Sequence, residues 1–220
     1  KYHFIDPVAN SYRFDYLPNN DQNRDVLVFN DEKIAFEKTL LAKPEDNAYY
    51  NQSQIKVGLD GSIECEVRNL GFGSKEASFR SFFSNNRPTK IKESLEERID
   101  EISSGAKLLT YTHSDPLNFK ERFGLNFKYN AQDYCRKAGD ILIFNVPEIW
   151  KSFPATGKKD RRYPIVIWNN SYYRDEAEFN APEGYELYHL PEPMEIKNQY
   201  FEFRSSYRQE GGKIFYQGEL

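Results

Sequence analysis

Long apolar runs and an excess of positive charge are both missing from this sequence. No stretch reaches the roughly 18 apolar residues that a membrane-spanning helix needs, so we expect no membrane span in this segment. The 30 basic and 34 acidic residues are spread along the chain and leave a formal net charge of −4. A nucleic-acid-binding protein carries a concentrated basic face, so we expect no nucleic-acid partner.

Cysteine and histidine are scarce, which argues against several kinds of site. Cys65 and Cys135 are too few for a disulfide scaffold, and with the three His residues they show no zinc-ligand spacing. Each lies in a strand-like run, which favours two buried free thiols, although a single disulfide stays open. The charges of Glu64 and Glu66 oppose a thiolate at Cys65, which disfavours a Cys-His-Asp triad within the chain. We expect no metal and no cofactor.

Aromatic residues and alternating apolar residues are plentiful. Phe, Tyr and Trp make up 16% of the chain, which favours strands. The clearest pattern has Ile55 and Val57 before an Asp-Gly pair, and Ile63 and Cys65 after it. All four residues share one face only if Val57 pairs with Ile63 and Ile55 with Cys65. The sequence therefore predicts a β-hairpin with a three-residue loop, 59–61, whose glycine is left-handed.

Two helical patterns interrupt the strand patterns. Ser74 suits the N-cap of a helix near residues 74–84. A second helix, near 89–104, has Ile and Leu at helical spacing along one side, and Gly105 suits its end. Strand patterns separated by Pro and Gly turns are found at 108–112, 125–129, 141–146, 163–168, 176–179, 185–190, 200–203 and 213–216.

These patterns predict a mainly β protein with a few helices. We expect an antiparallel, Ig-like β-sandwich that carries one or two helices, followed by a second small β-sandwich-like domain. The first is expected over residues 31–150. The basic, aperiodic stretch 151–161 is predicted to be a linker, which leaves residues 162–220 for the small C-terminal β-domain.

Two groups of residues are candidates for function. Residues 2–8 read as a short apolar strand in which the proline after Asp6 fixes its carboxylate. A carboxylate held there can orient a catalytic group, and the alternative is an ordinary strand-ending turn. Farther along, Trp168, Tyr172 and Tyr173 could form a platform on which sugar rings stack. Their alternative is a set of core and cross-strand aromatic pairs.

A series of short motifs, in this order, resembles the C-terminal region of a bacterial transglutaminase-like protein. The resemblance covers nearly the whole chain and implies that residues 1–30 are the tail end of the catalytic core. The motifs are 2–7, 16–18, Gln22 and 25–28 for that core, Asn47, 60–61, 73–80 and 139–140 for a linking β-sandwich, and 162–164, 182–185 and 190–193 for a trailing β-domain of unknown function.

By this resemblance, Asp6 is the third member of a Cys-His-Asp triad whose other two members lie outside this chain. It would accept a hydrogen bond from the His while the Cys attacks an acyl group. The chain departs from the family pattern at Tyr2, where Trp is usual, and at Val8, where Thr is usual. These departures leave open whether the parent protein is active.

We therefore expect a non-catalytic scaffold or accessory region of an acyl-transfer or peptide-hydrolysing protein. The chain has no initiator Met, and we expect a fragment that is inactive by itself and partnered by the upstream catalytic core. The resemblance also implies an exported or periplasmic bacterial protein. The alternative is a carbohydrate- or peptide-binding module, with a glycan or protein ligand at Trp168, Tyr172 and Tyr173.

Overall fold

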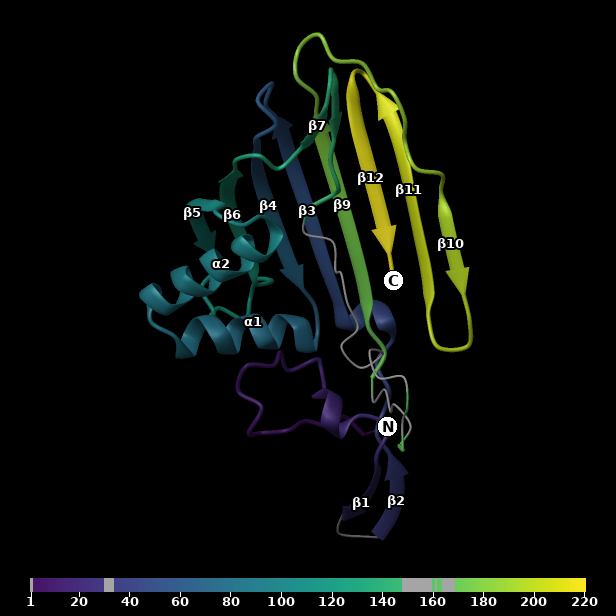
Figure 1. Cartoon of the computed structure of the whole chain (residues 1–220). Coiled ribbons are helices and arrows are strands. Elements are labelled where there is room, and N and C mark those ends of the chain that lie inside the picture. Colours follow the sequence, from purple (N-terminus) through teal and green to yellow (C-terminus); the bar gives the residue numbers. More distant parts are fainter. Residues whose placement is uncertain (1, 30–33, 148–159, 161, 164–168) are drawn as a thin grey trace.

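A sheet of eight strands forms the centre of the molecule (Figure 1). The computed structural model describes residues 2–29, 34–147, 160, 162–163 and 169–220. The strands of this sheet are β3 (Ala48–Val57), β4 (Ile63–Gly71), β5 (Lys107–His113), β6 (Gly124–Ala131), β9 (Tyr172–Asn180), β10 (Met194–Lys197), β11 (Glu202–Glu210) and β12 (Lys213–Glu219). Their order is β10-β11-β12-β9-β3-β4-β6-β5. The predicted fold class, mainly β with helices, is confirmed.

The hairpin of β3 and β4 has the predicted register. Ile55 pairs with Cys65 and Val57 with Ile63, and all four side chains are buried. The Gly58 N–H donates to the Ser62 carbonyl at 2.8 Å, which leaves the three-residue loop 59–61, and the loop glycine has φ +88°. The prediction is confirmed because a shift by one residue would have turned the apolar set to the other face.

The C-terminal strands continue the same sheet through one parallel pair. β9 runs alongside β3 from Ala48, which pairs with Tyr172, to Lys56, which pairs with Asn180. Every other neighbouring pair in this sheet is antiparallel. Paired residues of β3 and β9 lie about 124 positions apart, so no hairpin connects them. The predicted linker, 151–161, falls outside the described residues except for residue 160.

Two helices, α1 (Ser74–Asn85) and α2 (Pro88–Ile102), lie on the β4, β6 and β5 side of the sheet (Figure 1). Both were predicted, and α2 buries Ile91, Leu95 and Ile99 as the one-sided pattern required. These residues share a core with the buried side chains of β3, β4 and β6. In the described part of the chain, no helix combines the length and apolar character needed to cross a bilayer.

The start of α1 differs from the prediction by one residue. Ser74 is the first helical residue, and the N-cap position belongs to Gly73, with φ +57°. A Cβ at Gly73 would come within 2.5 Å of the Asp46 carbonyl oxygen and of the Tyr16 ring, so only glycine fits. The Asn47 side chain replaces the usual cap, because its Oδ1 accepts the Ser74 N–H at 3.1 Å.

Three predicted strands are wrong or shortened. Residues 2–6 have no strand, and 185–190 lie along the core without strand pairing. The run 141–146 gives only β8 (Ile141–Ile143), which pairs with β7 (Arg136–Ala138) in a separate small sheet. Apolar residues here pack onto the core from loops, as Leu187 does, and a loop can imitate a strand in composition. The pattern at 163–168 lies outside the described residues except for residue 163.

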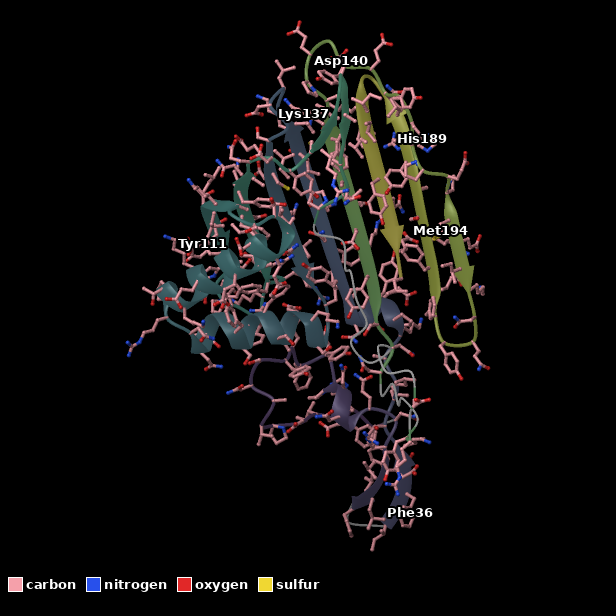
Figure 2. All side chains as sticks on the ribbon, viewed as in Figure 1. Phe36, Tyr111, Lys137, Asp140, His189 and Met194 are labelled. Atoms are coloured by element: carbon pink, nitrogen blue, oxygen red, sulfur yellow. The ribbon has the colours of Figure 1, made fainter. Side chains whose placement is uncertain are left out.

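An outlying hairpin and the N-terminal segment occupy one end of the molecule. β1 (Asp25–Phe29) pairs with β2 (Ile34–Lys38) below the main sheet in Figure 1, and Figure 2 shows Phe36 near its tip. Short 3-10 helices flank it, η1 (Asn19–Asp21) and η2 (Pro44–Asn47). At the far edges of the main sheet, β5 carries a register shift between Leu108 and Thr110, and β10 has only four residues.

Candidate functional site: the open polar face of the sheet

The two faces of the eight-stranded sheet differ in what covers them. On β3, Ser53, Ile55 and Val57 are buried, whereas Gln52 and Gln54, which alternate with them, are exposed. β4 alternates in the same way. Successive side chains of a strand point to opposite faces. We call the face beneath α1 and α2 the covered face, and the face that carries Gln52 and Gln54 the open face.

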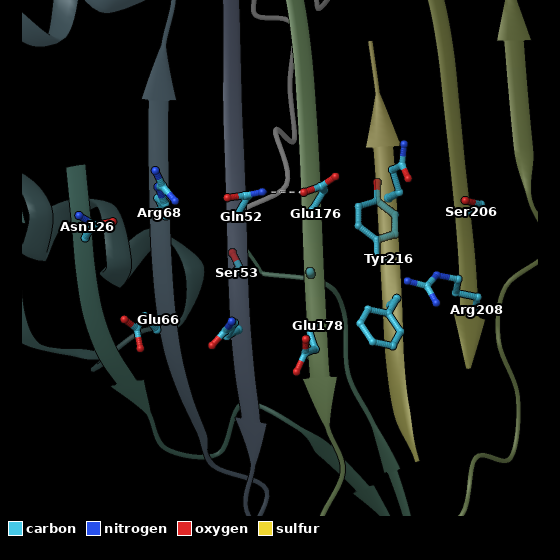
Figure 3. A pocket seen from close by; sticks show the side chains of 14 residues that line it. Gln52, Ser53, Glu66, Arg68, Asn126, Glu176, Glu178, Ser206, Arg208 and Tyr216 are labelled. Carbon is cyan, nitrogen blue, oxygen red and sulfur yellow. Dashed lines mark hydrogen bonds between the residues drawn. The ribbon is translucent and has the colours of Figure 1, made fainter. Parts of the chain in front are cut away.

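Side chains from six strands form two rows across the open face (Figure 3). Paired residues of neighbouring strands lie side by side on the same face, so the strand register fixes each row. The first row is Asn126, Arg68, Gln52, Glu176, Gln217 and Ser206. The second row is Lys128, Glu66, Gln54, Glu178, Phe215 and Arg208.

An open groove of about 520 Å³ runs over these two rows. All six residues of the first row line it, and so do all residues of the second row except Lys128. Figure 3 shows these side chains rising from neighbouring strands toward the same space. The groove is therefore built from rigid sheet positions and not from loops.

The carboxylates of the two rows are paired with nearby cations. The Lys128 ammonium lies 2.8 Å from Glu66, and the Lys213 ammonium lies 2.6 Å from Glu178. Gln52 donates to Glu176 at 2.8 Å, and Arg174 donates to the same carboxylate. Burial opposes ionisation of Glu176, but these hydrogen bonds outweigh it and lower its pKa. The open face thus carries many charges that largely cancel.

Four polar side chains of the rows are not used by the fold. Arg68, Asn126, Gln54 and Ser206 have no side-chain hydrogen bond or ion pair among the residues that the structure describes. All four are exposed to solvent. Guanidinium and amide groups offer several donors, and amides and hydroxyls also accept. The rows therefore hold donors and acceptors that are free to meet a ligand.

Aromatic rings border the two rows. At one end of the open face, Tyr50 makes edge contacts with Tyr172 at 5.9 Å and with Phe72 at 5.2 Å between ring centroids. Burial and the nearby Glu219 carboxylate raise the pKa of Tyr172 to about 12, so its hydroxyl stays protonated. Within the second row, the Arg208 guanidinium lies 4.1 Å from the centre of the Phe215 ring.

The structure does not bring the predicted aromatic platform together on one face. Tyr172 lies on the open face beside Tyr50. Tyr173, the next residue, lies on the covered face, where its hydroxyl accepts a hydrogen bond from the Lys75 ammonium at 2.6 Å. Trp168 lies outside the described residues. Of the three predicted residues, Tyr172 is the one that the structure places beside the polar rows.

Asp6 is half-buried and begins a turn in which Pro7 and Val8 are exposed. Its carboxylate accepts the Val8 N–H at 2.9 Å, the hydrogen bond of an Asx turn, and its carbonyl accepts the Ala9 N–H at 3.3 Å. Farther along the segment, Arg13 donates to the Phe119 carbonyl at 2.7 Å, and the Tyr16 ring lies against Gly73. The segment that carries Asp6 is thus anchored to α1 and to the loop before β6.

The two cysteines are free and buried, as predicted. Cys65 is fully buried in the β3–β4 hairpin. Burial, helped by the charge of Asp60, raises the pKa of the Cys135 thiol to about 11, so the thiolate is scarce at neutral pH. No group of three or more His, Cys, Asp or Glu side chains in the described residues is arranged to hold a metal ion.

Sequence reasoning missed the two rows of the open face. Their signal was visible in part, because Gln52, Gln54, Glu66 and Arg68 occupy the polar positions of the hairpin pattern. Such positions are ordinarily read as a solvated face. What joins them to β9, β12 and β11 is the order of strands in the sheet, which the pattern of a single hairpin does not reveal.

Comparison with known protein families gives one match. Residues 140–220 match the family model described as "Domain of Unknown Function with solved-structure structure (DUF3858)". The matched region begins in the turn before β8 and includes β9 to β12, so it contributes half of the strands of the eight-stranded sheet. No curated protein and no solved structure matched the chain.

Proposed function

We propose that this chain is the non-catalytic scaffold of a bacterial, exported transglutaminase-like protein that transfers acyl groups or hydrolyses peptides. The motifs from residue 2 to residue 193 that resemble this family support the proposal. The DUF3858 match at residues 140–220 also supports it, because this region includes residues 162–220, which the resemblance assigns to a trailing β-domain of unknown function.

One structural observation carries the proposal. The segment that holds Asp6 is anchored to α1 and to the loop before β6 by Arg13 and Tyr16. α1 in turn packs against β4, and β4 belongs to the sheet that contains the DUF3858-matching strands. A body of this kind can hold a carboxylate at a fixed place relative to a neighbouring catalytic domain, because the sheet leaves little room for movement.

In the proposed role, Asp6 accepts a hydrogen bond from the triad His and fixes its tautomer. The His then removes the proton from the Cys thiol, which attacks the acyl carbon. The thiols of this chain are not suited to be that nucleophile. Both are buried, and a reactive Cys needs access and a lowered pKa.

Two assays test the proposal. The chain alone, given a glutamine-containing peptide and a primary amine, should show no turnover that thiol alkylation abolishes. In the longer protein that the proposal implies, Asp6→Asn should lower kcat by about 100- to 10,000-fold, as loss of a triad carboxylate does. Asp140→Asn, in the exposed turn between β7 and β8, is the matched control (Figure 2). Alkylation-sensitive turnover by the chain alone, or equal effects of the two variants, would contradict the proposal.

A further inference from the structure

We propose that the open face binds a neutral oligosaccharide, which lies across the strands in the groove over the two rows. This inference does not depend on the proposed scaffold function. It rests on the shape of the groove, on the charge balance of the rows, and on the polar side chains that the fold leaves free.

The groove suits an extended ligand. The two rows run from β6 to β11, which spans five spacings between neighbouring strands, or roughly 24 Å at about 4.8 Å each. The groove holds about 520 Å³ and is lined along almost all of that length. A compact small molecule is normally enclosed by its pocket. An open groove of this length fits a chain of several sugar units.

The charge balance of the rows points to an uncharged ligand. Glu66, Glu176 and Glu178 each have a cation within hydrogen-bond distance. Arg68 is the cation of the first row that has no partner among the described residues. A nucleic acid or a polyanionic chain would need many uncompensated cations along this length. One free guanidinium among paired charges suits hydroxyl groups, to which it donates.

The free side chains can form the hydrogen bonds that a polyol ligand needs. Asn126, Gln54 and Ser206 both donate and accept, as sugar hydroxyls do. A peptide is a poorer match. Extended peptides bind sheets by pairing with an edge strand, whereas the backbone groups of β3, β4 and β9 beneath the groove are already paired on both sides.

Aromatic rings, and the guanidinium that lies over one of them, supply flat surface near the rows. Phe215 lies within the second row and is half-buried under the Arg208 guanidinium, 4.1 Å from the ring centre. Tyr50 and Tyr172 lie at the end of the same face. The C–H face of a sugar ring can pack on such surfaces while its hydroxyls reach the amides of Gln52 and Gln54.

Calorimetric titration of the chain tests the proposal. The probes are neutral hexasaccharides built from glucose, xylose, mannose or N-acetylglucosamine, with an extended hexapeptide and a polyuronate chain of similar length as competing classes. At least one neutral hexasaccharide should bind. The double variant Gln52→Ala, Gln54→Ala should weaken that binding by roughly ten- to thirtyfold, because each amide loses about one hydrogen bond.

A matched control variant and a second measurement show whether the sugar binds at the two rows. Gln209→Ala removes an exposed amide from β11 at a position paired with the buried Ile214, on the covered face, and should leave binding unchanged. NMR signals of the Gln52 and Gln54 side-chain amides should shift on addition of the sugar. The affinity should stay constant between low and high salt, since no ion pair forms.

Several outcomes would overturn the proposal. They are failure of every neutral hexasaccharide to bind, preference for the peptide or the polyuronate, a steep loss of affinity with salt, and equal weakening by the Gln209→Ala control. Thermal unfolding of the double variant should differ little from that of the parent chain, because both glutamines are exposed and the one hydrogen bond lost, from Gln52 to Glu176, is exposed as well. If the difference is large, the NMR shifts of the unmutated chain decide the question.

Discussion

On the covered face, Phe127 and Tyr129 of β6 are buried almost completely, at 1% and 0% exposure, whereas Asn126 and Lys128, which alternate with them, are exposed. The same backbone thus presents a packed apolar surface to α2 and a polar surface to solvent. The covered face is under strict packing demands, because interiors are as dense as organic crystals. The open face is free of those demands, so its residues are available for recognition.

The two faces should differ most in how much stability is lost when a phenylalanine on each face is replaced by alanine. Phe127→Ala should lower the free energy of unfolding by about 3–5 kcal/mol, because it opens a cavity in the core. Phe215→Ala, on the open face, should cost about 1 kcal/mol, since its ring is only half-buried. Urea unfolding of both variants measures the difference. Equal losses would show that something else covers the open face.

The next effect concerns a buried ion pair on the covered side. Arg80 donates to Glu76 Oε1 at 2.7 and 3.0 Å and to the carbonyls of Pro116 and Glu121, and both partners are nearly inaccessible. Arg80→Met should cost about 3 kcal/mol, because it leaves a buried carboxylate and two carbonyls short of donors. Lys92→Met breaks an exposed pair with Glu96 and should cost less than about 0.5 kcal/mol.

A double variant separates the pair from the packing around it. Arg80→Met combined with Glu76→Gln should be less destabilising than Arg80→Met alone, because the buried carboxylate, whose remaining ion-pair partner is the exposed Arg122, then carries no charge. Chemical unfolding of the three variants provides the cycle. Additive losses would mean that the two side chains act independently, against the geometry of their hydrogen bonds.

A smaller effect is expected at the start of α1. Asn47→Ala removes the acceptor of the Ser74 N–H and a 2.6 Å donation to the Asn170 carbonyl, and should cost about 1–2 kcal/mol. Asn126→Ala on the open face is the matched control, with an expected change within about 0.5 kcal/mol. Thermal unfolding resolves the two values. A neutral Asn47→Ala would mean that water caps this helix instead.

A further effect is a pH dependence that belongs to the covered face. Cys135 has a pKa of about 11 when folded, against 9.0 for an ordinary thiol. Above pH 9 the unfolded chain therefore loses this proton while the folded chain keeps it, so stability falls as pH rises from about 9 to about 11. The melting temperature of Cys135→Ala should fall less steeply over this range than that of the parent. Parallel curves would place the thiol in contact with solvent.

Local patterns were enough to predict the β3–β4 hairpin and both helices, because each is specified by residues close in sequence. The pairing of β3 with β9 was beyond such patterns, since it joins segments about 124 residues apart. The strand predicted at 185–190 failed because Leu187 and Leu190 reach the core from a loop. The two rows of the open face depend on that same distant pairing, which is why half of each row was hidden in the sequence.

The outer strands of the sheet determine whether a strand from another molecule can pair with it. At one edge, the register shift in β5 between Leu108 and Thr110 disturbs the line of backbone groups that a further strand would need. At the other, β10 offers only four residues, and Glu195 and Lys197 alternate along it. Short, irregular or charged edges resist strand addition from another molecule. The sheet should therefore remain at eight strands at high protein concentration, with its open face still accessible to a partner.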